Sequence, residues 1–245
     1  IGCSGEGNDT YNGGAGVDTV EYQSALAGIT VNLKTGTASS TDTSDTAKIG
    51  TDTLVDIENI IAGEFNDTLI GNTSPNSIDG GLGIDTVVYD TAKVTTTKSS
   101  TSILVNSDTL TNIERIQFTD TSLAFDIAGA NSAGGIYRTY QAAFNRTPDK
   151  VGFGYWIDRA DNGASAVQMA EGFVWSAEFQ TLYDVTTNDS YLVGNDIEAV
   201  VDLFYRNVLG RAPDQGGLTY YTSTIEDQNK TGGQVLAEMA DSAEN

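Results

Sequence analysis

The chain has 245 residues, with 34 Asp or Glu against 12 Lys or Arg, no His and a formal net charge of −22. This charge excludes a protein that grips nucleic-acid phosphates, which needs clustered cations, and it argues against an anionic membrane surface as a partner. The absence of histidine excludes Ser-His-Asp catalysis, Cys-His proteolysis and His-ligated zinc. No apolar run approaches the roughly 18 residues that membrane insertion requires. The single cysteine, Cys3, cannot form an internal disulfide.

The first residues already belong to a repeat with a period of nine. Ser4-Gly-Glu-Gly-Asn-Asp-Thr-Tyr-Asn12 is followed directly by Gly13-Gly-Ala-Gly-Val-Asp-Thr-Val-Glu21. The pattern returns at residues 62–70, in a degenerate form at 71–79, and again at 80–88. The first six positions are Gly-rich and end in Asp, and position eight is apolar. Because the chain begins inside this pattern, we expect it to be a fragment of a longer protein.

The composition of this nonapeptide predicts a calcium-binding turn followed by a minimal strand. Glycines at alternate positions permit positive φ and let carbonyl oxygens point inward, and the aspartate adds a carboxylate where those carbonyls converge. Calcium takes six to eight oxygen ligands, which suits such a loop. The alternative, ordinary Gly-Asp turns without metal, explains one copy but not several in phase. The predicted calcium-site residues are Gly5, Gly7, Asp9, Gly14, Gly16, Asp18, Gly63, Asp67, Gly81, Gly83 and Asp85.

Two nonapeptides, about 18 residues, would make one coil of a roll, so loops that far apart stack on the same edge. This places Asp67 near Asp85 around one ion. Asp9 and Asp18 fall on opposite edges, with stacking partners from upstream repeats or from the later run. The apolar residues predicted to point into the roll are Tyr11, Val20, Leu69, Ile78 and Val87.

Two departures from the pattern weaken particular loops. Phe65 replaces the glycine at position four of its copy, and Asn76 stands where the middle copy should have its aspartate. Because the middle loop lacks the carboxylate, we expect it to bind calcium weakly or not at all.

A longer duplication encloses the nonapeptides. Asp52-Thr-Leu-Val-Asp-Ile-Glu-Asn-Ile60 matches Asp108-Thr-Leu-Thr-Asn-Ile-Glu-Arg-Ile116. Its alternating apolar residues predict half-buried strands that continue the roll. For Asp52 and Asp108 we favour strand-end turns over ion binding. The Thr-rich stretches 37–47 and 95–102 predict exposed loops or edge strands.

The chain after residue 127 has a different character. Residues 127–135 are small and polar and predict a linker, and residues 136–245 predict amphipathic helices. This half is duplicated too, because Tyr140-Gln-Ala-Ala-Phe-Asn-Arg-Thr-Pro-Asp149 matches Tyr205-Arg-Asn-Val-Leu-Gly-Arg-Ala-Pro-Asp214 at an offset of 65. Each Arg-x-Pro-Asp segment predicts a turn with the next helix starting at its proline, capped by Thr147 in the first copy.

The duplicated Arg-Asp pairs are expected to brace helix starts. A copied motif favours an architectural role, since active sites are seldom duplicated within one small domain. A tyrosine-rich groove that binds glycan or peptide is the alternative that this half leaves open. The aromatic residues predicted to form its core are Tyr140, Phe144, Tyr155, Trp156 and Phe173.

Residues 4–88 resemble the RTX (haemolysin-type) calcium-binding repeats of secreted bacterial proteins. The segment from Ile113 to Asp149 resembles the junction that joins such repeats to a helical domain of unknown function carrying the Arg-x-Pro-Asp motif. The resemblance implies a calcium-bound parallel β-roll over residues 1–126 followed by an all-α domain. It also implies type I export and an extracellular or cell-surface location.

The expected function is a non-enzymatic, calcium-binding structural module of an adhesin, a surface layer or a filament. Stacked acidic loops repel one another without a cation, so we expect calcium to drive folding after export. The expected partners are calcium ions, with self-association or other surface proteins and glycans, and no nucleic acid. The alternative is an accessory C-terminal region of a secreted hydrolase or toxin whose catalytic domain lies upstream.

Overall fold

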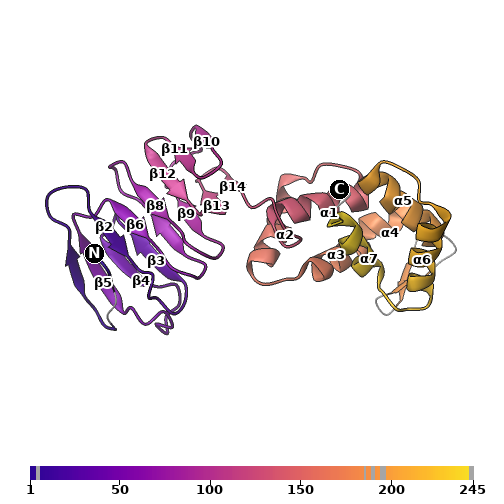
Figure 1. Ribbon diagram of the computed structural model, residues 1–245, viewed down its shortest axis with the longest axis horizontal. Helices are drawn as coiled ribbons and strands as arrows, with labels where there is room; N and C mark the ends of the chain where they lie inside the picture. Colours follow the sequence, from indigo (N-terminus) through magenta and orange to yellow (C-terminus); the bar gives the residue numbers. More distant parts are fainter. Residues whose placement is uncertain (4–5, 185, 189–190, 194–196, 243–245) are drawn as a thin grey trace. The chain divides into compact units, whose positions relative to one another are not determined.

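The computed structural model of the chain describes residues 1–3, 6–184, 186–188, 191–193 and 197–242. The chain divides into two compact units, Ile1–Phe125 and Asp126–Asn245, which carry the strands and the helices respectively in Figure 1. A β-roll is thus followed by a helical domain, as the sequence predicts. The expected linker ends earlier than its predicted boundary. Ser132 accepts the Gly135 N–H at 2.9 Å and caps the first helix, so residues 133–135 are already helical.

The first unit is built from two sheets whose strands follow one another around a coil. The eight-stranded sheet contains, in spatial order, β1 (Thr10–Asn12), β5 (Thr51–Val55), β4 (Thr37–Ser40), β3 (Ile29–Asn32), β7 (Thr68–Ile70), β9 (Thr86–Val88), β13 (Arg115–Gln117) and β14 (Ser122–Ala124). The six-stranded sheet contains β10 (Thr96–Lys98), β11 (Ile103–Val105), β12 (Asp108–Thr111), β8 (Ser77–Asp79), β6 (Asn59–Ile61) and β2 (Thr19–Glu21).

Consecutive nonapeptide strands alternate between the two sheets. β7 and β9 belong to one sheet and pair in parallel, with Leu69 opposite Val87, while β8 between them belongs to the other. The single apolar residue of each strand points between the sheets. Val20, Leu69, Ile78 and Val87 are at most 1% exposed and Tyr11 packs against this core half-buried, which confirms the inward set.

Antiparallel hairpins interrupt the parallel coils. β10 forms an edge strand over part of the stretch 95–102, as predicted. The expectation for stretch 37–47 is wrong at its start, because β4 lies inside the sheet between β3 and β5. Gly36 adopts φ +70° in the tight turn before it, and Ala38 is fully buried although the Thr-rich pattern predicts exposure there.

The second unit contains seven helices and one short hairpin in its described part. The helices are α1 (Ala133–Phe144), α2 (Lys150–Asp161), α3 (Ala166–Val174), α4 (Ala177–Tyr183), α5 (Ile197–Leu209), α6 (Gln215–Glu226) and α7 (Gly232–Ala240), and the hairpin pairs β15 (Thr186–Asn188) with β16 (Tyr191–Val193). At α3 and α7 the helix backbones come very close. A Cβ on Gly233 would lie 2.6 Å from the Glu171 nitrogen.

The aromatic core of this unit is largely as predicted. Tyr140, Phe144 and Phe173 are buried and Trp156 stacks on Phe173, with the ring centroids 4.8 Å apart. Tyr155 is the exception, because it is 49% exposed on the outer side of α2. Among the described residues no helix combines the length and apolar composition that crossing a bilayer requires.

Candidate calcium sites

The nonapeptide loops lie at the turns that enter the strands. The 62–67 and 80–85 loops stack on the same edge: the Leu82 N–H donates to the Gly63 carbonyl at 3.0 Å, and the Asp67 N–H donates to Asp85 Oδ1 at 2.8 Å. The predicted proximity of these two aspartates is therefore present. Asp9 precedes β1 in one sheet and Asp18 precedes β2 in the other, so they lie on opposite edges as expected. Gly5 lies outside the described residues.

A single hydrogen-bond pattern links each coil to a later one. In five steps the backbone N–H of the sixth loop position donates to a carboxylate from further along the chain, and the N–H of Ile29, the first residue of β3, does the same. We call this pattern the acid ladder. Its steps in the described chain run from Asp9 to Asp52, Asp18 to Glu58, Ile29 to Asp67, Asp67 to Asp85, Asn76 to Asp108 and Asp85 to Glu114, at 2.8–3.0 Å.

The two loops with a complete Gly-Gly-x-Gly-x-Asp sequence share one backbone conformation. Gly14 and Gly16 have φ of +82° and +140°, and Gly81 and Gly83 have φ of +92° and +125°. Residues other than glycine rarely adopt these φ angles, so this loop conformation requires glycine at both positions.

In the two loops that depart from the repeat pattern, a side-chain oxygen accepts a backbone N–H of the same loop. With Phe65 at position four, the Gly63 N–H donates to Asp67 Oδ2 at 3.1 Å. In the middle copy the Asn72 N–H donates to Asn76 Oδ1 at 3.0 Å. Both side-chain oxygens of Asp67 are occupied by N–H groups, since Oδ1 accepts from Ile29. The Asp67 carboxylate therefore accepts hydrogen bonds from the protein backbone with both of its oxygens, which the repeat pattern does not predict.

The complete loops leave one carboxylate oxygen each without a partner. Asp18 Oδ2 and Asp85 Oδ2 are buried and accept no hydrogen bond from the described residues. Asp85 is fully buried, and burial raises its pKa to about 8, helped by repulsion from Asp67, Glu114 and Asp79. A buried carboxylate without a compensating charge is costly. A cation at these loops would remove that cost, so the residues fit calcium.

Two glutamates outside the predicted site residues lie against these aspartates. Glu58 accepts the Asp18 N–H and Glu114 accepts the Asp85 N–H, each at 2.9 Å. The backbone bends in the same way before each, because Asp56 and Asn112 have φ of +52° and +51°.

Carbonyl oxygens accompany these glutamates at both loops. The Asp56 and Asn112 carbonyl oxygens lie so close to Gly13 and Gly80 that a Cβ on either glycine would collide with them. A Cβ on Gly80 would also lie 2.5 Å from Asp85 Oδ2. The duplicated Asp-Thr-Leu-x-x-Ile-Glu segment is the sequence signal that could have identified the two glutamates.

Asp52 and Asp108 have a role that neither sequence expectation describes. Asp52 lies within β5 and Asp108 begins β12, and both are buried. Each accepts a tyrosine hydroxyl, from Tyr22 at 2.9 Å and from Tyr89 at 3.0 Å, besides its step of the acid ladder. Burial raises the pKa of Asp52. These aspartates tie a strand end to a loop and are not turn residues.

Side chains alone do not form a metal cage here. Within the described ranges no group of three His, Cys, Asp or Glu side chains is placed to hold a metal ion. Calcium at the complete loops must therefore draw on backbone carbonyls together with Asp18 or Asp85. This donor set is the one that the glycine spacing predicts.

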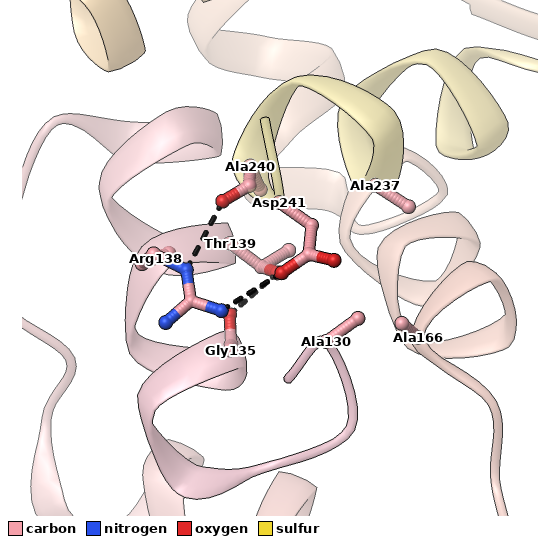
Figure 2. A pocket seen from close by; sticks show the side chains of 8 residues that line it. All are labelled: Ala130, Gly135, Arg138, Thr139, Ala166, Ala237, Ala240 and Asp241. Carbon is pink, nitrogen blue, oxygen red and sulfur yellow. Dashed lines mark hydrogen bonds and ion pairs between the residues drawn. The ribbon is translucent and has the colours of Figure 1, made fainter. Parts of the chain in front are cut away.

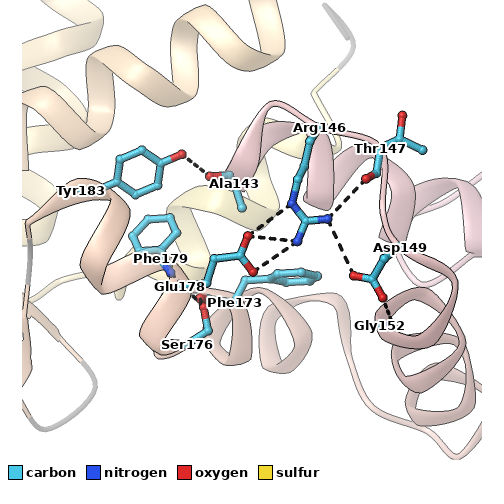
Figure 3. Close-up of polar contacts among 10 residues, drawn as sticks. All are labelled: Ala143, Arg146, Thr147, Asp149, Gly152, Phe173, Ser176, Glu178, Phe179 and Tyr183. Carbon is cyan, nitrogen blue, oxygen red and sulfur yellow. Dashed lines mark hydrogen bonds and ion pairs between the residues drawn. The ribbon is translucent and has the colours of Figure 1, made fainter.

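Polar residues of the helical unit serve its architecture. Figure 3 shows Arg146 between Glu178, which it contacts at 3.0 Å, and the Thr147 carbonyl. The Arg146 guanidinium also lies over the Phe144 ring, 5.3 Å from its centroid. Asp149 caps α2 by accepting the Gly152 N–H at 2.8 Å, and Asp214 caps α6 in the same way. The prediction that these helices start at proline with Thr147 as a cap is wrong by two residues, because the aspartate side chain reaches the third N–H.

The residues that line one small pocket in this unit form hydrogen bonds with one another. Figure 2 shows Arg138 reaching from α1 to the Ala240 carbonyl and to Asp241, with Ala130, Ala166 and Ala237 around them. Arg138 also donates to the Gly129 carbonyl. The arginine therefore fastens the end of α7 to the start of the unit.

Family comparisons agree with this division of the chain. A model described as "RTX calcium-binding nonapeptide repeat (4 copies)" matches residues 4–20 and 52–87. A model described as "Domain of unknown function (DUF4214)" matches residues 129–183 and 188–245. No curated protein matches the chain.

Proposed function

Because the chain carries RTX calcium-binding nonapeptide repeats followed by a DUF4214 domain, we propose that it is a calcium-stiffened structural and interaction module of a secreted bacterial protein. In this proposal it serves an adhesin, a surface layer or a filament at the cell surface, and it catalyses no reaction itself. The observation that carries it is the pair of buried, unpartnered aspartate oxygens at the two complete loops.

Calcium would switch the roll from an expanded to a folded chain. Without the ion, buried carboxylates in the acid ladder repel one another and the net charge of −22 favours expansion. With the ion, Asp18 and Asp85 gain a counter-charge, and the sites exist only once their loops have stacked. Extracellular calcium at about millimolar concentration suffices for modest sites of this kind.

The helical unit would supply the interaction surface, and the repeats would act as a calcium-dependent spacer. Support comes from the exposed aromatic side chains of that unit, because aromatic residues are enriched at interfaces; they are Tyr137, Tyr155, Trp175 and Tyr220.

A calcium titration that starts in chelator tests the proposal, with magnesium as the control ion. Far-UV circular dichroism should gain β-signal cooperatively with calcium and not with magnesium. Both tryptophans, Trp156 and Trp175, lie in the helical unit, so their fluorescence reports whether that unit is already folded. A roll that is fully folded in chelator would contradict the proposal.

A further inference from the structure

Both complete nonapeptide loops are held along their later side by the duplicated Asp-Thr-Leu-x-x-Ile-Glu segment. The Gly13 N–H donates to the Val55 carbonyl at 3.0 Å. The Gly80 N–H donates to the Thr111 carbonyl in the same way, at 3.1 Å. At the other end of each loop the aspartate N–H donates to the glutamate of the same segment, at 2.9 Å in both copies. We call residues 13–18 with 55–58 the first junction, and residues 80–85 with 111–114 the second junction.

Two oxygens converge beside the first glycine of the second junction. The Asn112 carbonyl oxygen and Asp85 Oδ2 both lie no more than 2.5 Å from the point where a Cβ on Gly80 would stand. Calcium holds its oxygen ligands at about 2.3–2.6 Å. The two oxygens are therefore close enough to each other for one ion to contact both.

The first junction repeats this arrangement. The Asp56 carbonyl oxygen lies against Gly13, and the carboxyl carbon of Asp18 is 2.8 Å from the same Cβ position. In both junctions the Oδ2 of the loop aspartate is buried and has no partner among the described residues. A buried carboxylate oxygen of this kind points to a missing cation.

The earlier side of the Asp85 loop is occupied by hydrogen bonds instead. There Asp85 Oδ1 accepts the Asp67 N–H at 2.8 Å. The Asp67 carboxylate itself accepts the Ile29 N–H with Oδ1 and the Gly63 N–H with Oδ2. The oxygen of Asp85 that is left for an ion is thus Oδ2, which lies beside the second junction.

Each junction also brings a second negative charge to the loop aspartate. Glu58 and Glu114 are half-buried, and each accepts the N–H of that aspartate through Oε2. Burial raises the pKa of Asp85, and repulsion from nearby carboxylates, Glu114 among them, adds to the rise. Two carboxylates match the double charge of calcium, and the affinity of a calcium site depends on how many charged ligands it has.

We propose that each junction binds one calcium ion between the complete loop and the duplicated segment. At the second junction the ion contacts Asp85 Oδ2 and the Asn112 carbonyl, and Glu114 supplies the second negative charge. The ion therefore lies on the later side of Asp85, whereas the repeat pattern predicts it on the earlier side, next to Asp67. At the first junction the corresponding residues are Asp18, Asp56 and Glu58.

This inference rests on the proposed function of the roll as a calcium-binding module and names residues that hold its ions. Asn112 and Glu114 lie outside residues 4–20 and 52–87, which the nonapeptide-repeat model matches. The second site is thus completed by a segment that is not itself a nonapeptide.

Calcium titration of the full chain, followed by far-UV circular dichroism, tests the inference with variants that remove one charge. Glu114→Gln keeps an acceptor for the Asp85 N–H and loses only the charge. Because that charge serves the ion, the variant should need at least about tenfold more calcium to fold, and Glu58→Gln should behave alike. Equilibrium dialysis at a calcium concentration that just saturates the parent chain should find fewer ions bound to each variant.

Glu64→Gln is the matched control, because Glu64 is exposed in the neighbouring loop 62–67 and belongs to neither junction. It removes the same charge from a chain with a net charge of −22. Relief of repulsion alone should leave the calcium requirement unchanged or lower it. The junction variants and the control should therefore differ in the direction of their shifts.

Two results would overturn the inference: junction variants that need no more calcium than the parent chain, or an equal increase in Glu64→Gln. If Glu114→Gln gained no β-signal at any calcium concentration, Glu58→Gln would decide in its place. A parent chain that binds no calcium would contradict the proposed function. A parent chain that folds with calcium, together with junction variants that fold at the same concentration, would contradict this inference alone.

Discussion

Replacing Asp85 by asparagine should change the stability of the roll in opposite directions with and without calcium. The carboxylate is fully buried, and its Oδ2 has no partner among the described residues. Asparagine keeps the shape and an acceptor for the Asp67 N–H but removes the charge. Without calcium that charge is a cost, and with calcium it is a ligand.

The magnitude follows from the raised pKa of Asp85. Burial moves the pKa from 3.8 to about 8. A folded-state pKa above the unfolded value means that stability is full below about pH 4 and is lost as the pH rises through about 8. At pH 7 the folded chain keeps a proton that the unfolded chain has already released, at a cost of about 4 kcal/mol. Asp85→Asn should recover much of this cost in chelator.

Circular dichroism measures both sides. In chelator at pH 7, where the parent roll is largely unfolded, Asp85→Asn should show more β-signal than the parent chain, and its β-signal should depend less on pH between pH 5 and 8. In calcium the same variant should unfold at lower urea than the parent chain. A variant that is destabilised equally in both conditions would refute the reasoning, because Asp85 would then act as a structural acceptor only.

Three further changes probe other contacts. Tyr89→Phe should destabilise the roll by about 1–2 kcal/mol, because Asp108 Oδ2 loses its hydroxyl partner, and Tyr22→Phe should do the same through Asp52, both measured by urea unfolding in calcium. Asp149→Ala should cost the helical unit about 1 kcal/mol through loss of the α2 cap, measured by tryptophan fluorescence, with exposed Asp158→Ala as the control. Gly233→Ala should destabilise the same unit by more than about 2 kcal/mol, because the added Cβ would collide with the Glu171 backbone. This loss should exceed the gain from alanine's better helix propensity. An unchanged unfolding midpoint would show that α3 and α7 can move apart at little cost.

The roll is largely predictable from its sequence because the period leaves few choices. Glycine spacing fixes the turns, and one apolar residue per short strand fixes the inward side, so the repeat alone places Val20 and Val87 in the core. The same repeat predicts that Asp67 and Asp85 share an edge. Local rules of this kind hold because each coil contacts only its neighbours.

Contacts between distant segments are not predictable in the same way. The pairing of Tyr22 with Asp52 spans a hairpin whose path depends on the whole sheet, and no local pattern indicates which aspartate a tyrosine will meet. Glu58 lies outside the nonapeptides, so their pattern does not select it, although its duplication as Glu114 is visible. Tyr155 is an aromatic residue next to Trp156 in the sequence, so the sequence predicts both in the core. The two side chains differ in their angular position around α2, which leaves Tyr155 exposed.

The direction of the acid ladder has a consequence for synthesis. In all six described steps the N–H comes from the earlier segment and the carboxylate from the later one. A coil leaving the ribosome therefore lacks its acceptor until the chain has grown by 18 to 43 residues, the separations at Asp67–Asp85 and Asp9–Asp52. A step of the acid ladder cannot form before its later segment has been synthesised. Each earlier loop therefore gains this stabilising contact only after synthesis has passed well beyond it.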